Sequence, residues 1–469
     1  MRYDVLVVGG GTAGCVLAAR LSESPDRQVC LVEAGPDYGS LADGRWPTEL
    51  LDARDMAGSH LWRAGGEDGR PLGGRVLGGS SSVNACMVVA GTAADYDEWG
   101  AGWSFADLRP FLDRARTELR TARANTDRPT AFQRAFLDAA QAAGHPPVDP
   151  DDLATPVGVG PYPANVVDGR RWNAAFAYLD PARGRPNLSI VADTLVDRVL
   201  FDGSRASGIL TSDGRELEAE HVLLAAGAYF TPAILLRSGI GPEAELQRHG
   251  TRVLEALPVG ERLLDHCGTD VSFEVSTELQ TETGAEAAEH GVFASHVVAK
   301  AASTACAADS WDLHLVPWIS RVEDGRFRGY VIVFHMKPLS SGSVRLASID
   351  SAVPPIVERG FLSREEDLGP ILEGIELARA IAAQEPLHGL LDTEVAPGAA
   401  DPAEFVRTTI RNYFHPAGTC PLGTVVDAHG RVFGTEGLYL ADASFMPTIP
   451  RANTNLTTAA IAEKIAAGF

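Results

Sequence analysis

The segment Asp4–Glu33 constrains the fold of this chain more than any other stretch. It opens with the apolar run VLVV, which is typical of a buried strand, and passes directly into glycines at G-x-G-x-x-G spacing; a helical pattern and a second apolar run complete it. In a β-α-β unit of this kind Gly9 forms the tight turn, Gly11 allows the backbone to approach a pyrophosphate, and Gly14 allows helix and strand to pack closely. The segment therefore predicts a nucleotide site of the Rossmann type.

The same segment indicates which nucleotide fits. The helix N-terminus presents unpaired N–H groups and the positive end of the helix dipole to the phosphates. Glu33 can accept a hydrogen bond from a ribose hydroxyl, and its charge disfavours a 2′-phosphate, since two negative groups would meet. The segment alone is compatible with NAD or FAD, so an NAD-dependent dehydrogenase stays open at this point, as does a strand-turn-helix unit without a ligand.

Composition limits the kinds of partner. A chain of 469 residues is long enough for two or three domains, and its 45% hydrophobic and 22% charged residues are ordinary for a globular protein. The 62 acidic residues exceed the 40 basic ones and give a formal net charge of −22, which repels nucleic acids and anionic membranes. Apolar runs stay well below the roughly 20 residues that a membrane span needs. We therefore expect neither a nucleic-acid partner nor a membrane span.

The cysteines and the first residues bear on the compartment. The six cysteines are scattered and form no C-x-x-C pair, which favours reduced, buried thiols. The first strand begins almost at once, which leaves no room for a secretory signal. We expect a cytoplasmic protein. No histidine or cysteine group has metal-ligand spacing, so we expect no metal site.

Periodicity outlines the rest of the chain. Short alternating runs between Thr269 and Ala347 indicate an antiparallel sheet in a second domain. The segment 35–74 has the composition of a loop. Helices are expected at Trp103–Arg116 with Ser104 as N-cap, at Thr130–Ala143, at Glu365–Ala383, near Thr231 and after Asn453.

Several separated motifs, in a fixed order along the chain, resemble those of the glucose-methanol-choline (GMC) oxidoreductase family of FAD-dependent enzymes that oxidise alcohols. Besides the N-terminal fingerprint, the motifs are GRVLGGSSSVN at 74–84, DYDEW at 95–99, GAYFTPAILLRSGIG at 227–241, GERLLDH at 260–266, HPAGTCPLG at 415–423, ADASFMP at 441–447 and NTN at 453–455. The resemblance covers essentially the whole chain and decides the nucleotide in favour of FAD.

The resemblance implies a mixed fold, α/β and α+β overall. A Rossmann-like FAD-binding domain would be assembled from two discontinuous segments, residues 1–268 and 425–469. A substrate-binding domain built on a mostly antiparallel sheet would comprise residues 269–424 and contribute His415.

The resemblance also implies a set of cofactor contacts. The glycine turn would hold the pyrophosphate, Glu33 the adenosine ribose, and the backbone of Val196 the adenine, while the loop 75–84 would wrap the pyrophosphate and isoalloxazine. Asp442 and Ala443 would reach the ribityl-phosphate side, and Thr454 and Asn455 the pyrimidine edge. The full set is Gly9, Gly11, Thr12, Ala13, Gly14, Glu33, Ala34, Arg75, Gly78, Gly79, Ser80, Val83, Asn84, Ala85, Val196, Ala226, Asp442, Ala443, Asn453 and Thr454.

The position of Val83 bears on how the cofactor is attached. Some members of the family have a histidine there and bind FAD covalently. A valine side chain cannot form such a bond, so the resemblance implies non-covalent FAD.

His415 and Asn453 carry the predicted chemistry. Oxidation of an alcohol by hydride transfer to flavin N5 requires the hydroxyl proton to leave, and imidazole is the side chain whose ordinary pKa suits a base near neutral pH. An asparagine can donate a hydrogen bond to the developing alkoxide without competing for the proton. The matching family positions hold His with either His or Asn.

The predicted reaction converts an alcohol into an aldehyde or ketone, with oxygen, a quinone-type compound or another acceptor reoxidising the flavin. Tyr413 beside His415 gives a slight preference for a non-oxygen acceptor, because its bulk could hinder oxygen. The alternative is an FAD-containing hydroxynitrile-lyase-like enzyme without net redox chemistry. A non-catalytic flavoprotein is disfavoured because both His415 and Asn453 are retained.

Other positions bear on the substrate. Glu289 lies where choline-oxidising relatives have an acid, but its neighbours offer no aromatic cage for a quaternary ammonium, so choline is disfavoured. His335, Trp318 and Phe414, with Tyr413, are candidates to line the cavity. Asp265 and His266 resemble a structural turn of the family. The identity of the alcohol and the oligomeric state stay open.

Overall fold

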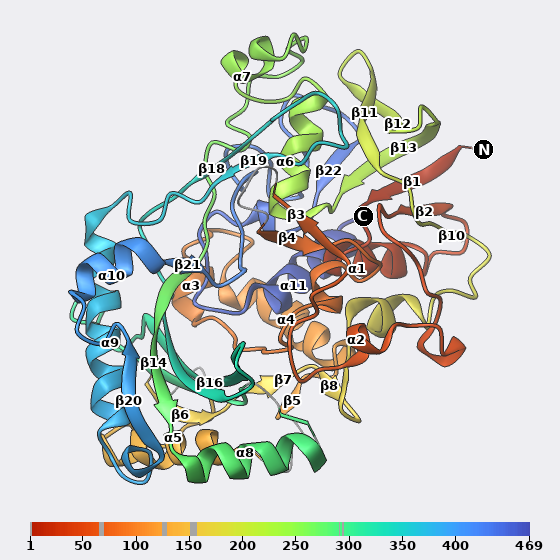
Figure 1. Ribbon diagram of the computed structural model, residues 1–469. Helices are drawn as coiled ribbons and strands as arrows, with labels where there is room; N and C mark the ends of the chain where they lie inside the picture. The colour runs from red at the N-terminus through yellow and green to blue at the C-terminus, as the bar shows by residue number, and fades with distance from the viewer. Residues whose placement is uncertain (1, 65–69, 124–128, 151–156, 290, 293–294) are drawn as a thin grey trace.

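The structure is a computed structural model of the chain. It describes residues 2–64, 70–123, 129–150, 157–289, 291–292 and 295–469. Two seven-stranded sheets, each with its own hydrophobic core, dominate this part of the chain (Figure 1). The mixed α/β fold and the mostly antiparallel second sheet confirm the predicted fold class.

The first sheet is the Rossmann-like layer. Its strand order is β10-β2-β1-β13-β12-β11, with β22 beside β13; the pairs among β10, β2, β1, β13 and β22 are parallel, and β11 and β12 extend the sheet antiparallel. The strands are β1 (Tyr3–Val8), β2 (Val29–Val32), β10 (Leu188–Val191), β11 (Val196–Asp202), β12 (Arg205–Thr211), β13 (Glu216–Leu224) and β22 (Leu438–Leu440). The apolar runs of β1 and β2 are buried, as a parallel sheet covered on both faces requires.

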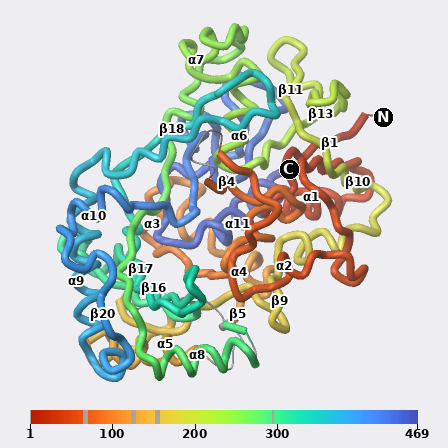
Figure 2. Tube along the Cα trace, viewed as in Figure 1, coloured from red at the N-terminus to blue at the C-terminus, as the bar shows by residue number. Residues whose placement is uncertain are grey.

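Two helices from opposite ends of the sequence pack together beside this sheet. Helix α1 (Thr12–Leu21) contacts α11 (Thr454–Ala467), and Figure 2 shows the two running side by side. Glu463 on α11 is buried and accepts hydrogen bonds from the Arg20 guanidinium, with Nε to Oε2 at 2.9 Å. This partly buried charge pair joins the C-terminal helix to the helix of the predicted nucleotide-binding motif.

The second sheet has the order β20-β14-β17-β16-β15-β6, with β21 beside β14. Its described pairs are antiparallel. The strands are β6 (Gly158–Pro161), β14 (Cys267–Val275), β15 (Val297–Ala301), β16 (Leu313–Arg321), β17 (Phe327–His335), β20 (Leu391–Ala396) and β21 (Arg411–Asn412). Helices α5 (Ala131–Ala142) and α9 (Leu368–Ala382) pack on it.

The packing of α5 and β6 bears on the predicted domain ranges. Both elements lie between residues 131 and 161, yet they join the core and the edge of the second sheet. The division into 1–268 with 425–469 and 269–424 stays a prediction, and this segment is where packing and the predicted boundary differ.

Local sequence signals set the helix starts. Helix α4 (Phe105–Glu118) begins after Ser104, whose hydroxyl accepts the Asp107 N–H, which confirms the predicted cap. Helix α6 (Gly227–Arg237) begins four residues before the expected Thr231, because the distant carboxylate of Asp442 accepts the Gly227 N–H at 2.8 Å.

Shorter elements connect these layers. The expected loop 35–74 contains α2, β3 and β4. The remaining elements are α2 (Thr48–Leu51), α3 (Ala93–Asp97), α7 (Glu243–Arg248), α8 (Thr277–Glu289), α10 (Pro402–Thr409), β3 (Leu61–Arg63), β4 (Pro71–Gly74), β5 (Ala122–Arg123), β7 (Pro163–Ala164), β8 (Val166–Val167), β9 (Arg170–Arg171), β18 (Ser343–Arg345) and β19 (Ile356–Glu358). In the part of the chain that the structure describes, no helix has the length and apolar character that would carry it through a bilayer.

Candidate active site

Close backbone contacts at glycines form the base of the candidate site. A Cβ on Gly14 would overlap the carbonyl oxygen of Gly9, so α1 can start this close to β1 only without a side chain. Gly79 has a φ of 55°, and a Cβ there would lie 2.6 Å from the Cα of Gly11. The Gly78 N–H also donates to the Gly10 carbonyl at 2.7 Å. The predicted flavin loop therefore lies directly on the nucleotide-binding turn.

Glu33 lies at the end of β2, beside that turn. Its buried carboxylate accepts the N–H groups of Gly10 at 2.6 Å and Gly35 at 2.7 Å. Burial raises the pKa of Glu33 to about 7, against the lowering effect of these N–H groups. Its backbone carbonyl accepts the Thr194 N–H at 2.8 Å, two residues before Val196. The structure thus brings together the residues predicted for the adenosine end.

The loop after β4 continues from the glycine contact toward the second sheet. Arg75 is exposed, and its Nε donates to the Ala34 carbonyl at 3.4 Å. Val83 is buried and its carbonyl accepts the Ala57 N–H at 3.0 Å. Ala85 lines a small hollow together with Trp318, which places that predicted cavity residue beside the loop.

Asp442 connects three segments. Its Oδ2 accepts the Gly227 N–H at 2.8 Å and the Thr231 hydroxyl at 2.6 Å, and its Oδ1 accepts from Ser444. Burial raises its pKa. The next carbonyl, of Ala443, accepts the Gly418 N–H at 3.0 Å, so this loop is joined to the loop that carries His415.

The residues present fit a flavin at the junction of α1 and α11. Asn453 is the N-cap position of α11, and the Thr12 hydroxyl at the start of α1 donates to Asn455 Oδ1 at 2.6 Å. The Nδ2 of Asn455 is buried and has no hydrogen-bond partner among the described residues. The N-terminus of α1, predicted to hold the pyrophosphate, thus meets the N-terminus of α11, predicted to lie at the pyrimidine edge, beside an unpaired amide donor.

His415 and Asn453, predicted as catalytic, lie side by side. The Asn453 Nδ2 is 3.3 Å from His415 Nε2, and the Asn453 Oδ1 accepts the Val89 N–H at 2.9 Å. Because Oδ1 is engaged by a donor, the amide nitrogen faces the histidine and donates. His415 Nε2 is therefore an acceptor, and the proton of the neutral ring is on Nδ1.

His266 contacts the Nδ1 atom of His415, and Asp265 accepts its backbone N–H. The sequence indicated these two residues only as parts of a turn. His415 Nδ1 lies 2.8 Å from His266 Nδ1, and the His415 backbone N–H donates to Asp265 Oδ1 at 2.8 Å. His266 Nε2 is buried and unpaired among the described residues. The motif LLDH marks His266 in the sequence. Nothing in the motif indicates that His266 contacts His415, which lies 149 residues further along the chain.

Burial keeps these histidines neutral. It lowers the pKa of His415 to about 3, and it lowers the pKa of His266 well below its ordinary value, with the neighbouring His415 as a further cause. Burial has the opposite effect on Asp265 and raises its pKa to about 7. At neutral pH His415 is therefore an uncharged base in a site shielded from water.

Aromatic rings enclose the pair on one side. The Tyr413 ring centroid lies 4.4 Å from that of His415 and stacks on Phe334 at 3.7 Å, while its hydroxyl contacts Met87 Sδ at 3.2 Å. His314, which sequence reasoning missed, is buried and stacks flat on Trp311. In the sequence His314 is one residue of the alternating pattern of β16, and this pattern does not mark it as part of a site.

The other candidate residues differ in position. Phe414 has a positive φ of 62° and a side chain 48% exposed, so it points away from the buried pair. His335 lies between two buried acids, with Nε2 to Asp312 at 4.0 Å and Nδ1 to Asp367 at 3.7 Å. Glu289 is exposed at the end of α8. Of these candidates, Tyr413 is the one in contact with His415.

A buried charge network explains the motif DYDEW. Asp95 is fully buried and its Oδ1 accepts from Arg451 at 2.6 Å and from Lys337 at 3.2 Å. Arg451 precedes Asn453 by two residues. The network therefore fixes the backbone from which Asn453, predicted as catalytic, projects.

Comparison with known proteins finds relatives over nearly the whole chain. Two family models, both described as GMC oxidoreductase, match residues 3–268 and 338–462. An oxygen-dependent choline dehydrogenase of Pectobacterium atrosepticum is 35% identical over 99% of this chain and 94% of its own length. The mitochondrial choline dehydrogenase of Homo sapiens is 34% identical over 99% of this chain and 89% of its own length.

A solved structure has the same architecture. Pyridoxine 4-oxidase from Mesorbium loti superposes with a TM-score of 0.84 and is 26% identical; the match covers 100% of this chain and 99% of that one. The family that the sequence motifs resemble is thereby confirmed, and proteins of this family bind FAD.

The Gly79–Gly11 contact can be tested with a matched pair of glycine substitutions. We expect Gly79→Ala to lower the FAD bound per polypeptide severalfold, because the added methyl meets the Gly11 backbone. Gly100 also has a positive φ, 86°, but nothing lies within 4 Å of a Cβ there. Gly100→Ala should therefore cost only the backbone strain of about 1 kcal/mol and keep full FAD content. Equal FAD content in the two variants would contradict the assignment.

Proposed function

This chain belongs to the GMC oxidoreductase family, and from that premise we propose that it oxidises an alcohol to an aldehyde or ketone with non-covalently bound FAD. The observation that carries the proposal is the buried pair of an acceptor and a donor, His415 Nε2 and Asn453 Nδ2, 3.3 Å apart. When bound, FAD supplies the hydride acceptor at its N5 atom.

His415 is proposed as the base. Its Nε2 carries a lone pair because Nδ1 holds the ring proton, and its low pKa keeps it uncharged when substrate arrives. A substrate hydroxyl that enters between the two side chains meets Nε2 as the proton acceptor and Asn453 Nδ2 as a hydrogen-bond donor. As the proton moves to Nε2, the donor stabilises the charge that develops on oxygen, and a buried site strengthens both interactions.

His266 is proposed as a positioning residue for His415. The contact between the two Nδ1 atoms gives the His415 Nδ1–H an acceptor, which selects the tautomer with a free Nε2. When His415 gains a second proton, His266 shares the positive charge through the same contact. Asp265 holds the His415 backbone and so fixes the ring position.

The residues and the relatives support a small alcohol as substrate. Two of the relatives are named choline dehydrogenases, whereas the exposed position of Glu289 does not favour an acid beside a quaternary ammonium. Choline should therefore be assayed as the alcohol that the relatives' names suggest and Glu289 disfavours, together with aryl alcohols that match the ring of Tyr413. Oxygen, a quinone-type compound or another acceptor remains the proposed oxidant of the enzyme.

The compartment stays a prediction as well. The six cysteines are free thiols, and five of them are buried, which supports the predicted cytoplasmic location.

Replacing the base tests the mechanism. We expect His415→Ala to retain FAD and to slow anaerobic bleaching of the flavin by substrate about 10²–10⁴-fold, the usual contribution of a general base. His388→Ala removes an exposed histidine and should leave the rate unchanged. Stopped-flow absorbance measures both rates, and an undiminished rate in His415→Ala would refute the assignment.

Replacing His266 tests the tautomer argument. We expect His266→Ala to slow flavin bleaching about tenfold to a hundredfold, a typical cost of losing a group that orients a functional side chain. His266→Asn offers an oxygen to the Nδ1–H of His415 and should restore part of the rate.

The pH profile distinguishes this role from a purely structural one. The wild-type acid limb of kcat/KM should lie below pH 5, because the pKa of buried His415 is about 3 and the base loses its lone pair only below that range. In His266→Ala, water reaches His415 and the limb should move up toward pH 6.5. A limb that stays in place while the rate falls would mean that His266 only supports the fold.

The attachment of FAD can be read directly. Because Val83 offers no nucleophile, acid precipitation should release the yellow cofactor into the supernatant. Colour that stays with the precipitated protein would show a covalent bond and overturn this part of the proposal.

A further inference from the structure

One histidine of the second sheet points away from the core of its own domain. On β16 the side chains alternate between the two faces of the sheet. Leu313 and Leu315 pack in the core that α5 and α9 cover, so His314, which lies between them, belongs to the opposite face. This second face is the one that carries the contacts with the candidate active site.

Two further residues of β16 show where this face lies. Val316 is buried in one apolar cluster with Val89, whose backbone N–H donates to Asn453 Oδ1 at 2.9 Å. Trp318 lines a small hollow together with Ala85 of the predicted flavin loop. The face of the sheet that carries His314 is therefore packed against segments that hold the predicted donor and the predicted cofactor.

Aromatic rings connect His314 with the proposed base. Its partner across the sheet is Phe334 on β17, which stacks on the ring of Tyr413 at 3.7 Å. The Tyr413 ring centroid lies 4.4 Å from that of His415 and 6.0 Å from that of His314, nearly perpendicular to the latter. Tyr413 is thus a neighbour of both histidines.

The ring of His314 is buried without hydrogen bonds. The residue is fully buried, and neither ring nitrogen has a partner among the described residues. Trp311 stacks on one face of the imidazole, with ring centroids 4.7 Å apart and planes 8° from parallel. This contact fixes the plane of the ring and leaves both nitrogens at its edge. Because buried polar atoms are costly when unpaired, two such atoms on one side chain indicate a partner that arrives from outside the chain.

The chemistry of that partner follows from the charge of the ring. Burial lowers the pKa of His314 well below its ordinary value, and the charges of Lys300 and His415 act in the same direction. A neutral imidazole has one N–H donor and one nitrogen lone pair. A hydroxyl group can both accept and donate a hydrogen bond, so it is complementary to either nitrogen.

We propose that His314 binds a second hydroxyl group of the substrate, away from the carbon that loses the hydride. The substrate class is then an alcohol with a further hydroxyl, either a short diol or an aryl alcohol with a hydroxyl on its ring. This inference rests on the proposed function, and it names the substrate class of the same site. His314 is a binding residue in this account, and the proton transfer stays with His415.

Pairs of alcohols that differ by one hydroxyl group test the inference. Benzyl alcohol is compared with its ring-hydroxylated derivatives, and n-butanol with the butanediols. The measurement is the second-order rate constant of anaerobic flavin bleaching in the holoenzyme. We expect at least one hydroxylated member to react about tenfold or more faster than its plain partner, because the plain alcohol leaves the buried nitrogens unpaired.

Substitution of His314 then locates the preference. His314→Phe keeps a flat ring for Trp311 to stack on and removes both nitrogens, so the ratio of the two rate constants should fall to about one. His314→Gln keeps a donor and an acceptor and should retain part of the ratio. FAD content measured by absorbance shows whether each variant is folded, and His314→Leu replaces His314→Phe if the larger ring displaces the cofactor.

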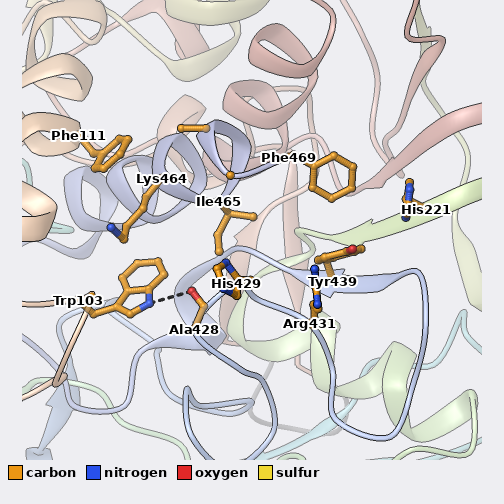
Figure 3. Close-up of a pocket in the computed structure, with 13 residues that line it drawn as sticks. Trp103, Phe111, His221, Ala428, His429, Arg431, Tyr439, Lys464, Ile465 and Phe469 are labelled. Carbon is orange, nitrogen blue, oxygen red and sulfur yellow. Dashed lines mark hydrogen bonds between the residues drawn. The ribbon is translucent and has the colours of Figure 1, made fainter.

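A matched control removes a histidine from a different pocket. Figure 3 shows His429 in the wall of a pocket of about 500 Å³ at the far end of α11. Lys464, which also lines that pocket, lies about 16 Å from Asn453 along the helix at 1.5 Å per residue. His429→Phe should therefore keep the wild-type ratio.

Two results would overturn the inference while the proposed function stands. One is flavin bleaching at similar rates by both members of every pair, and the other is a preference that survives in folded His314→Phe. A flavin that none of these alcohols bleaches would contradict the proposed function itself, and the inference with it. The two failures are therefore distinguishable in the same experiment.

Discussion

The structure depends on backbone contacts that only glycine permits. Gly14 lets α1 begin against the carbonyl of Gly9, and Gly79 lets the loop after β4 lie on Gly11. The first contact turns β1 into α1 at the carboxyl end of a parallel sheet, where nucleotides bind in open sheets of this kind. The second carries the chain from this turn toward the second sheet. The predicted pyrophosphate turn and the predicted flavin loop therefore meet at these two points.

The chemistry depends on a second constraint, which is burial. His415, His266 and Asp265 are buried. The His415 ring therefore has few hydrogen-bond partners, and its contact with His266 decides which ring nitrogen carries the proton. A histidine held neutral costs stability, because its charged form is excluded at acidic pH. The result is that the proposed base, His415, and the proposed donor, Asn453, meet from separate segments.

Local patterns were sufficient to predict the β1-α1-β2 unit, the cap at Ser104, the helix after Thr130 and the antiparallel second sheet, because each depends on neighbours in sequence. His415 and Asn453 were found through motifs. The contact between His266 and His415 was not predictable, because 149 residues separate them and a turn residue looks the same whatever it meets.

Other misses have the same cause. The early start of α6 depends on a carboxylate 215 residues away, and β6 joins a sheet whose other strands follow position 266 in the chain. Contacts between residues far apart in the sequence determine both the start of α6 and the place of β6. The periodicity of a single sequence carries no information about such contacts.

The central claim is that this fold removes a hydride from an alcohol. Anaerobic mixing of the purified protein with a panel of primary and secondary alcohols, followed by visible absorbance, measures this directly. The account predicts a yellow protein whose flavin absorbance at least one alcohol bleaches. A protein that stays yellow with every alcohol while it cleaves a cyanohydrin would indicate the lyase alternative. A colourless protein that needs NAD would contradict the account at its base.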